Sequence, residues 1–225
     1  MLGRKKSSAP RPSAALAAAA AYIAEVALRS VQTEDGGVRV EDYLTVIAAA
    51  TGEAVLVSAG LFDIEHNELA PGSAVFGDRI NAILTGDSIS LADMTADTVL
   101  GLYCAELVPV PIAPDALPDP RRLYEHVAST VNSAPWGYVA TTVEADNQPR
   151  VMALRVAFDM RATVDHAVAT AGVDRSQRWV PCVLALCVAV RQVQSAIDMR
   201  LATTLILEVV FAMAKTVPMS ADKLG

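Results

Sequence analysis

Cysteines and aromatic residues are scarce in this chain. Aromatic side chains make up 5% of the 225 residues, and the only thiols are those of Cys104, Cys182 and Cys187. The number of cysteines is odd, their surroundings are apolar, and there is no C-x-x-C pair and no Asn-x-Ser/Thr acceptor. These features are typical of reduced, buried thiols, so we expect a cytoplasmic protein.

Uninterrupted apolar runs long enough to cross a bilayer are also missing near the C-terminus. A membrane-spanning helix needs about 20 consecutive apolar residues. The two most apolar stretches, 180–190 and 201–214, are shorter and are interrupted or separated by charges, at Arg191, Asp198, Arg200 and Glu208. The sequence therefore predicts two core helices here and no transmembrane segment.

The N-terminus combines basic residues with an alanine-rich run, a pattern that imitates a signal peptide. Pro10 and Pro12 separate the charges from the run, and Glu25 and Arg29 lie at its end. These features favour a disordered basic tail over residues 1–12 and an ordinary helix capped near Ser13. Peripheral contact with a membrane through this tail and helix is an alternative.

Positive charge is in short supply outside that tail. The chain carries a net charge of −7, and four of its 18 basic residues lie within residues 1–12. Residues 13–225 therefore hold 14 basic and 25 acidic residues, a net charge of −11. An acidic body repels phosphate, which argues against a nucleic-acid partner.

Hydrophobic residues are abundant, at 53% of the chain, and most are Ala, Val and Leu. Their spacing and the positions of helix breakers predict an all-α fold, a bundle of about seven helices. The second of these, at 40–59, has a face of small residues at Ala48, Ala49 and Gly52, where another helix can pack closely. The expected ranges are 13–32, 40–59, 78–85, 91–107, 121–132 and 150–171, with 176–217 as one bent helix or two consecutive ones.

Five of the 12 prolines fall within residues 109–120. Proline fixes φ and removes a hydrogen-bond donor, so this segment is predicted to be an extended connector. It would join an N-terminal helical part, 13–108, to a C-terminal part, 121–225. One continuous domain over 13–225 is the alternative.

A local ambiguity concerns residues 138–156. The stretch 138–143 is rich in β-branched residues, and 151–156 could pair with it in a short β-hairpin. The helical spacing that continues through Arg155, Asp159 and Arg161 favours a helix over the second half of this region.

The densest group of polar side chains lies in an irregular, glycine-containing segment at 60–79. Asp63, Glu65, His66 and Glu68 fall within six residues, and carboxylates beside an imidazole can bind a divalent metal or act in acid–base catalysis. No regular element fixes their positions, so a solvated acidic loop is the favoured interpretation, and metal binding by these four residues is the alternative.

Trp136 and Tyr138 form the only aromatic cluster expected on a loop. Such side chains either anchor a partner protein or fold back over the core, and the sequence does not distinguish the two. In the helix predicted at 201–214, Thr204 and Glu208 form a polar stripe with Lys215, which predicts one solvent-exposed edge.

No catalytic residue or cofactor site can be assigned from these patterns. The leading hypothesis is a non-catalytic interaction or regulatory module that self-associates, as a homodimer, or binds a protein partner. The alternatives are an enzyme or small-ligand binder that uses the loop at 60–79, and a membrane-peripheral protein.

Overall fold

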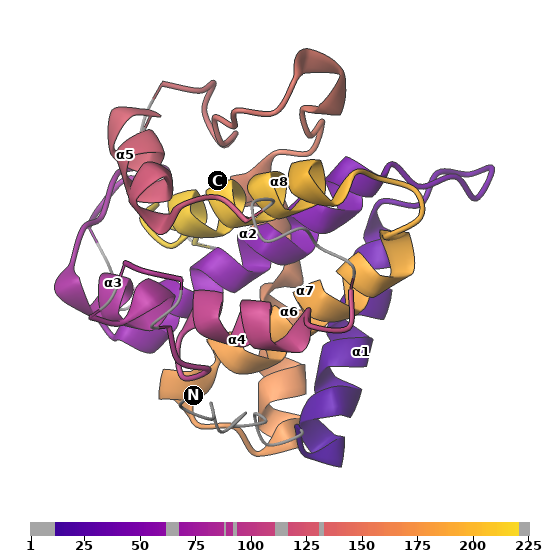
Figure 1. Cartoon of the computed structure of the whole chain (residues 1–225), viewed down its shortest axis with the longest axis horizontal. Helices are drawn as coiled ribbons and strands as arrows, with labels where there is room; N and C mark the ends of the chain where they lie inside the picture. The colour runs from indigo at the N-terminus through magenta and orange to yellow at the C-terminus, as the bar shows by residue number, and fades with distance from the viewer. Residues whose placement is uncertain are drawn as a thin grey trace, which may run out of the picture.

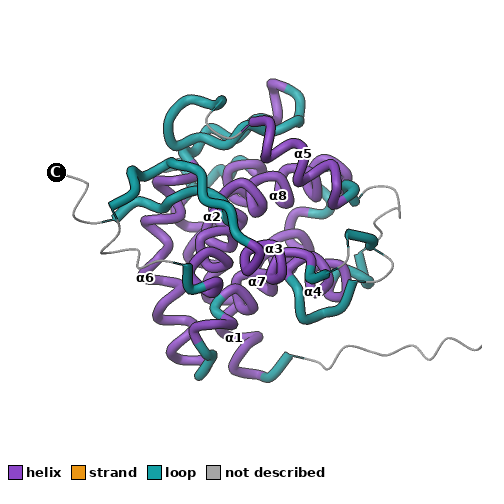
Figure 2. The backbone as a smooth tube through the Cα atoms, turned by 90° about the vertical axis from the view of Figure 1, so that its left-hand side faces the viewer, coloured by secondary structure: helices purple, strands orange, loops and turns teal. Residues whose placement is uncertain are grey.

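The computed structural model describes residues 12–61, 68–87, 89–91, 94–110, 117–130 and 133–220. Over these residues the protein is a bundle of eight α-helices without a named strand, which confirms the predicted all-α fold (Figures 1 and 2). The helices are α1 (Ala14–Ser30), α2 (Val40–Ala59), α3 (Asp78–Thr85), α4 (Val99–Glu106), α5 (Pro120–Thr130), α6 (Ala153–Ala171), α7 (Trp179–Val193) and α8 (Met199–Met213).

Local sequence signals account for several helix ends. The Ser13 hydroxyl accepts a hydrogen bond from Leu16 N and caps α1, and the Asp198 carboxylate caps α8 in the same way. α2 has the predicted bounds and ends at Gly60, whose φ of 62° is in the left-handed region that favours glycine. The predicted start of a helix at 91 is wrong, because Thr98 caps α4 by accepting a hydrogen bond from Gly101 N.

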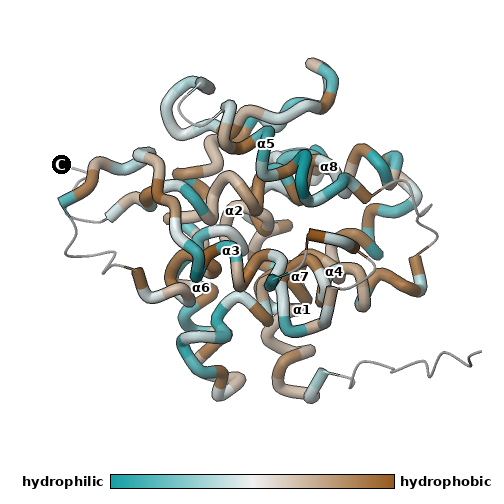
Figure 3. Tube along the Cα trace, turned by 60° about the vertical axis from the view of Figure 1, so that its left-hand side comes forward, coloured by the Kyte–Doolittle hydropathy of each residue, from teal (hydrophilic) through white to brown (hydrophobic). Residues whose placement is uncertain are grey.

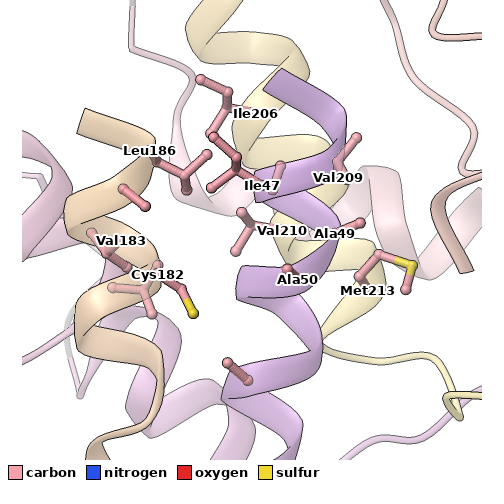
Figure 4. Close-up of a cluster of buried hydrophobic side chains, with 14 of the residues drawn as sticks. Ile47, Ala49, Ala50, Cys182, Val183, Leu186, Ile206, Val209, Val210 and Met213 are labelled. Carbon is pink, nitrogen blue, oxygen red and sulfur yellow. The ribbon is translucent and has the colours of Figure 1, made fainter. Parts of the chain in front are cut away.

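α2 runs through the middle of the bundle (Figure 1). It packs against α6, α7 and α8, and α1 packs against α6 and α7, so helices from both sides of the 109–120 segment share one hydrophobic core. Figure 4 shows α2 between α7 and α8, with Ile47 directed at side chains of both neighbours. The predicted close approach at Gly52 is confirmed, since a Cβ placed on this residue would lie 2.5 Å from Met213 Cβ.

α2 is also the one described helix long and apolar enough to span a membrane, but such a test is equally met by core helices. Most of its apolar window, 89%, is buried inside the bundle. The segments at 180–190 and 201–214 lie within the α7 and α8 regions of the same core.

The alternative β-hairpin at 138–156 does not form. Side chains take up the backbone groups that a ladder would use: the Gln148 amide donates to the carbonyls of Thr141 and Val143, and Asp42 Oδ1 accepts hydrogen bonds from Arg150 N and Val151 N. α6 begins at Ala153, so the second predicted strand is largely helical. Residues 138–143 are therefore an extended loop segment held by side chains.

Candidate functional site

The chain between α5 and α6 lies at the edge of the bundle, beyond α5 and α8 (Figures 1 and 2). Two side chains hold it there. His126 Nε2, on α5, is 2.9 Å from the Ala140 carbonyl oxygen, and since that oxygen can only accept, the ring nitrogen donates. Glu208, on α8, accepts hydrogen bonds from Thr142 N at 2.7 Å and from the Thr142 hydroxyl at 2.6 Å. The segment is thus attached to both helices.

The polar stripe of α8 is mostly buried, so the expectation of an exposed edge is wrong at Glu208 and Lys215, whereas Thr204 is partly exposed. Glu208 is 4% exposed and Lys215 is 5% exposed. The extended segment covers Glu208, and its two hydrogen bonds offset part of the cost of burying a carboxylate. Glu208 is therefore buried because another segment of the chain covers it. The spacing of polar residues on α8 gives no information about such a covering segment.

A hollow of about 530 Å³ lies on one side of this segment, between the N-terminal halves of α5 and α8 and reaching Glu208 on α8. We call it the polar hollow. Its apolar lining comes from Leu117, Pro118 and Leu123, and its polar lining from Asp119, Arg122, His126, Thr142, Arg200, Thr204 and Glu208. Arg122 and His126 are four residues apart on α5, and Arg200, Thr204 and Glu208 follow the same spacing on α8, so each helix presents one polar face to the hollow.

A second hollow, of about 230 Å³, lies between the C-terminal ends of α5 and α8 and the Trp136 loop. We call it the apolar hollow. Among the described residues that line it, Tyr138 is the one with a titratable side chain. The hydroxyls of Thr130 and Thr216 donate to carbonyls one turn earlier, so neither is paired with a base. This hollow can bind an apolar group of complementary shape, but its described residues are not arranged for acid–base catalysis.

Trp136 rests on the turn formed by residues 70–73. Ser73 N donates to Ala70 O, with Pro71 second in the turn and Gly72 third at φ 87°, the pattern of a type II turn. The Trp136 indole donates to Pro71 O at 3.3 Å, and a Cβ on Gly72 would lie 3.2 Å from Trp136 Nε1. Glycine at 72 is therefore required both by φ and by the close approach of the indole.

Exposed apolar side chains gather on this side of the molecule. Five of the eight large hydrophobic residues found exposed in the described chain lie on the 69–77 loop, on the Trp136 loop, or against them. Leu61 belongs to the group because a Cβ on Gly77 would lie 2.9 Å from its Cδ1. We call this group the neutral face; its members are Leu61, Leu69, Phe76, Trp136 and Tyr138.

The 69–77 loop is held in place by the chain that follows α8. Gly72 N donates to Val217 O, Val217 N to Ser73 O, and Val75 N to Lys215 O, each at 2.8 Å. These three bonds form a short antiparallel pairing around the bridge between Ala74 and Thr216. The loop is consequently fixed to the bundle although it has no regular structure of its own.

Lys215 lies where α3, α5 and α8 meet. Its Nζ donates to Asn81 Oδ1 at 2.8 Å and lies 4.7 Å from the centre of the Tyr124 ring and 5.5 Å from that of Phe76. Burial lowers the pKa of this amine. Lys215 lines neither hollow, and its contacts join elements of the fold.

Of the four acidic-loop candidates, Glu68 is the one that lies within the described residues. Asp63, Glu65 and His66 lie outside the described residues, and Glu68 is exposed. Among the described residues, no group of three or more His, Cys, Asp or Glu side chains is placed to hold a metal ion. Trp136 and Tyr138 are on a loop, as predicted, and are 58% and 40% exposed.

The polar hollow was not predicted from the sequence. A signal was available in the repeated spacing of four residues on two helices, Arg122 to His126 and Arg200 to Thr204 to Glu208. The spacing of residues on one helix shows which side chains lie on the same face, but it does not show which other element lies opposite that face. The pairing of α5 with α8 is a tertiary contact, and it decides that these two polar faces meet.

Comparison with protein-family models, with curated protein sequences and with solved structures finds no match for this chain.

Proposed function

We propose that this protein is a non-catalytic interaction module that self-associates as a homodimer through the neutral face. The observation that supports this proposal is the clustering of Leu61, Leu69, Phe76, Trp136 and Tyr138 on adjoining loops. Large exposed apolar groups of this kind mark contact surfaces, and Trp and Tyr are enriched among residues that dominate binding energy. The apolar hollow beside them adds a concave feature that a side chain from a partner can fill.

Charge favours a second copy of the chain as the partner. Residues 127–143 and 69–77, which hold four of the five members of the neutral face, contain no charged residue, although 19% of the whole chain is charged. Two acidic bodies repel each other, so they associate best through surfaces that lack acidic groups. A basic partner would instead select one of the acidic parts of the surface. In a twofold dimer the same neutral face is used by both copies.

The inert chemistry around the neutral face supports a non-catalytic role. The apolar hollow has no pairing of a nucleophile with a base among its described lining residues. Burial also raises the pKa of the thiols, to about 11 for Cys104 and about 12 for Cys182. Protonated, buried thiols are consistent with the cytoplasmic location that we propose for this protein.

Sedimentation velocity of the full chain over a range of concentrations tests the proposal. We expect the wild type to dimerise, and we expect Trp136→Glu and Tyr138→Glu to be monomeric, because each places a charge in an apolar contact. Circular dichroism would show that the helical content of both variants is unchanged. The substituted side chains are 58% and 40% exposed, so the loss of stability should be modest.

Tyr22→Glu is the matched control. Tyr22 is 40% exposed, as is Tyr138, but it lies on α1 against His166 and away from the neutral face. This variant should dimerise as the wild type does. A wild type that stays monomeric at every concentration, or a Tyr22→Glu variant that dissociates as readily as Tyr138→Glu, would contradict the proposal.

A further inference from the structure

The polar hollow combines two cationic side chains from different helices with a buried carboxylate. Arg122 is the third residue of α5 and Arg200 the second residue of α8, so both guanidinium groups belong to first helical turns, where the helix dipole adds positive potential. Glu208 lies two turns further along α8, about 12 Å from Arg200 along the helix axis. The hollow thus has both of its arginines, together with Asp119, at the helix starts and the carboxylate of Glu208 deeper along α8.

Glu208 lines the hollow and its carboxylate retains hydrogen-bonding capacity. Each of its oxygens accepts one hydrogen bond from Thr142, whereas a carboxylate has about four acceptor positions. Arg122 forms no hydrogen bond or ion pair within the part of the chain that the structure describes. A charged ligand can therefore bind to both groups without first breaking a described ion pair.

The remaining lining limits the chemical class of ligand. Asp119 and Glu208 balance the charges of Arg122 and Arg200, so a ligand of a single charge would meet one sign that repels it. His126 donates its Nε2 proton to Ala140 and Thr142 bonds to Glu208, and these two residues shape the wall. The volume of about 530 Å³ falls within the range of small-molecule sites.

We propose that the polar hollow binds a small zwitterion of amino-acid size. Its anionic group pairs with the guanidinium group of Arg122, at the end of the hollow that Arg200 also lines, and its ammonium group pairs with the buried carboxylate of Glu208. Leu117 and Leu123 contact the apolar part between the two charged ends. This site is separate from the neutral face, so loss of dimerisation does not affect the inference.

Isothermal titration calorimetry tests the proposed zwitterion binding. The zwitterions titrated differ in the distance between their ammonium and carboxylate groups. The probes are glycine, 4-aminobutyrate and 6-aminohexanoate, with butyrate, butylamine and inorganic phosphate as singly signed comparisons. We expect at least one zwitterion to bind at least about tenfold more tightly than any comparison compound, because only a zwitterion satisfies both signs. The most favourable chain length would report the distance between the two charged ends of the site.

Arg121 and Arg122 provide a matched pair of variants. They are adjacent exposed arginines on α5, but Arg122 lines the hollow and Arg121 does not. Arg122→Gln should weaken the best zwitterion about tenfold or more, and Arg121→Gln should change its affinity by less than about twofold. Glu208→Gln should abolish the preference for 4-aminobutyrate over butyrate, with circular dichroism reporting whether its fold is intact.

Three results would overturn the inference. Binding of phosphate or butyrate as tight as that of the zwitterions would make the hollow a simple anion site. Failure of all three zwitterions to bind would remove the assignment altogether. An equal loss of affinity in Arg121→Gln and Arg122→Gln would show that general charge, not the hollow, attracts the ligand.

Discussion

α2 and α5 show how differently two helices of one small protein can be used. In α2, 17 of 20 residues are buried, including the ionisable Asp42 and Glu53, whereas in α5 only Pro120, Leu123 and Val127 of 11 residues are buried. Figure 3 shows the same contrast, with α5 largely hydrophilic in colour beside the apolar helices of the centre. α2 is surrounded by α6, α7 and α8, while α5 has α8 as its main packing partner.

This difference in packing indicates which of the two helices can contribute polar side chains to a binding site. Polar groups on a surrounded helix have little access to water, so most of them need structural partners, as Asp42, Thr51 and Glu53 have; the Thr45 hydroxyl is an exception without one. A helix packed on one side keeps a polar face free to line a hollow, as Arg122 and His126 do. Substitutions in α2 should therefore change mainly stability, and substitutions in the polar face of α5 mainly binding.

The largest expected effect is at Glu53 in α2. Its carboxylate is 3% exposed and bonds to Arg161 through two contacts, Oε1 to Nε at 2.7 Å and Oε2 to Nη2 at 3.1 Å. Glu53→Ala would leave a largely buried guanidinium without its anion, at a cost of about 3–5 kcal/mol in the free energy of unfolding. Urea denaturation followed by circular dichroism measures this loss.

An exposed pair on α6 is the control for Glu53. Arg155 and Asp159 are four residues apart, and their side chains are 53% and 50% exposed. Asp159→Ala should change stability by less than about 1 kcal/mol, because water screens this pair. If Glu53→Ala and Asp159→Ala lowered the free energy of unfolding by the same amount, burial of the ion pair would not determine its contribution to stability.

A smaller effect is expected at Gly52, where α2 meets α8. A Cβ at this position would lie 2.7 Å from Val210 O and 2.8 Å from Ala214 N, and backbone atoms cannot move aside as a side chain end can. Gly52→Ala should therefore destabilise the protein by about 1–3 kcal/mol, although alanine is the better helix former. Thermal denaturation with a concentration-matched wild type provides the measurement.

Gly77→Ala serves as the comparison, because its new Cβ would meet only Leu61 Cδ1, the end of an exposed side chain. Gly77 has φ −174°, which any residue adopts. This variant should stay within about 0.5 kcal/mol of the wild type. If Gly52→Ala instead raised the melting temperature, α2 and α8 would be far enough apart to accommodate a Cβ at position 52, which would contradict the close approach described here.

The contrast between α2 and α5 also separates what the sequence could predict from what it could not. The bounds of α2 and its close-packing face at Gly52 follow from hydrophobic spacing and small residues, which are local signals. The environment of Glu208 depends on residues 138–143, more than 60 positions earlier in the chain. No local pattern encodes that contact, so Glu208, which was predicted to lie on a solvent-exposed edge, proved to be buried.

The aromatic loop lies between these two cases. Pro135, Trp136 and Gly137 predict a turn, and Tyr138 N does donate to Pro135 O, with Gly137 at φ 82°. The sequence could not tell whether Trp136 would cover the core or remain accessible. Its position on Pro71 and Gly72 results from the pairing of residues 72–75 with residues 215–217, a long-range feature.

The smallest expected effect concerns Lys215, which joins the α5 and α8 side of the molecule to α3. Burial lowers the pKa of this amine below the ordinary value of 10.5, so the unfolded chain binds its proton more tightly than the folded protein does. Between the lowered pKa and 10.5, the unfolded state therefore carries more protons, and the contribution of Lys215 to stability rises with pH. Below that window its unfavourable contribution to stability is complete and constant.

Selective ¹³Cε labelling of lysine gives a direct measurement of the pKa, because Lys215 is the single lysine between Lys6 and Lys223 and Lys215→Met identifies its signal. Its signal should titrate at a lower pH than those of Lys5, Lys6 and Lys223, and the stability of the wild type relative to Lys215→Met should increase as the pH rises through this window. If all four lysines titrated together, the aromatic rings of Tyr124 and Phe76 and the amide of Asn81 would be stabilising the charged amine as well as water does, and the end of α8 would be no more desolvated than the polar face of α5.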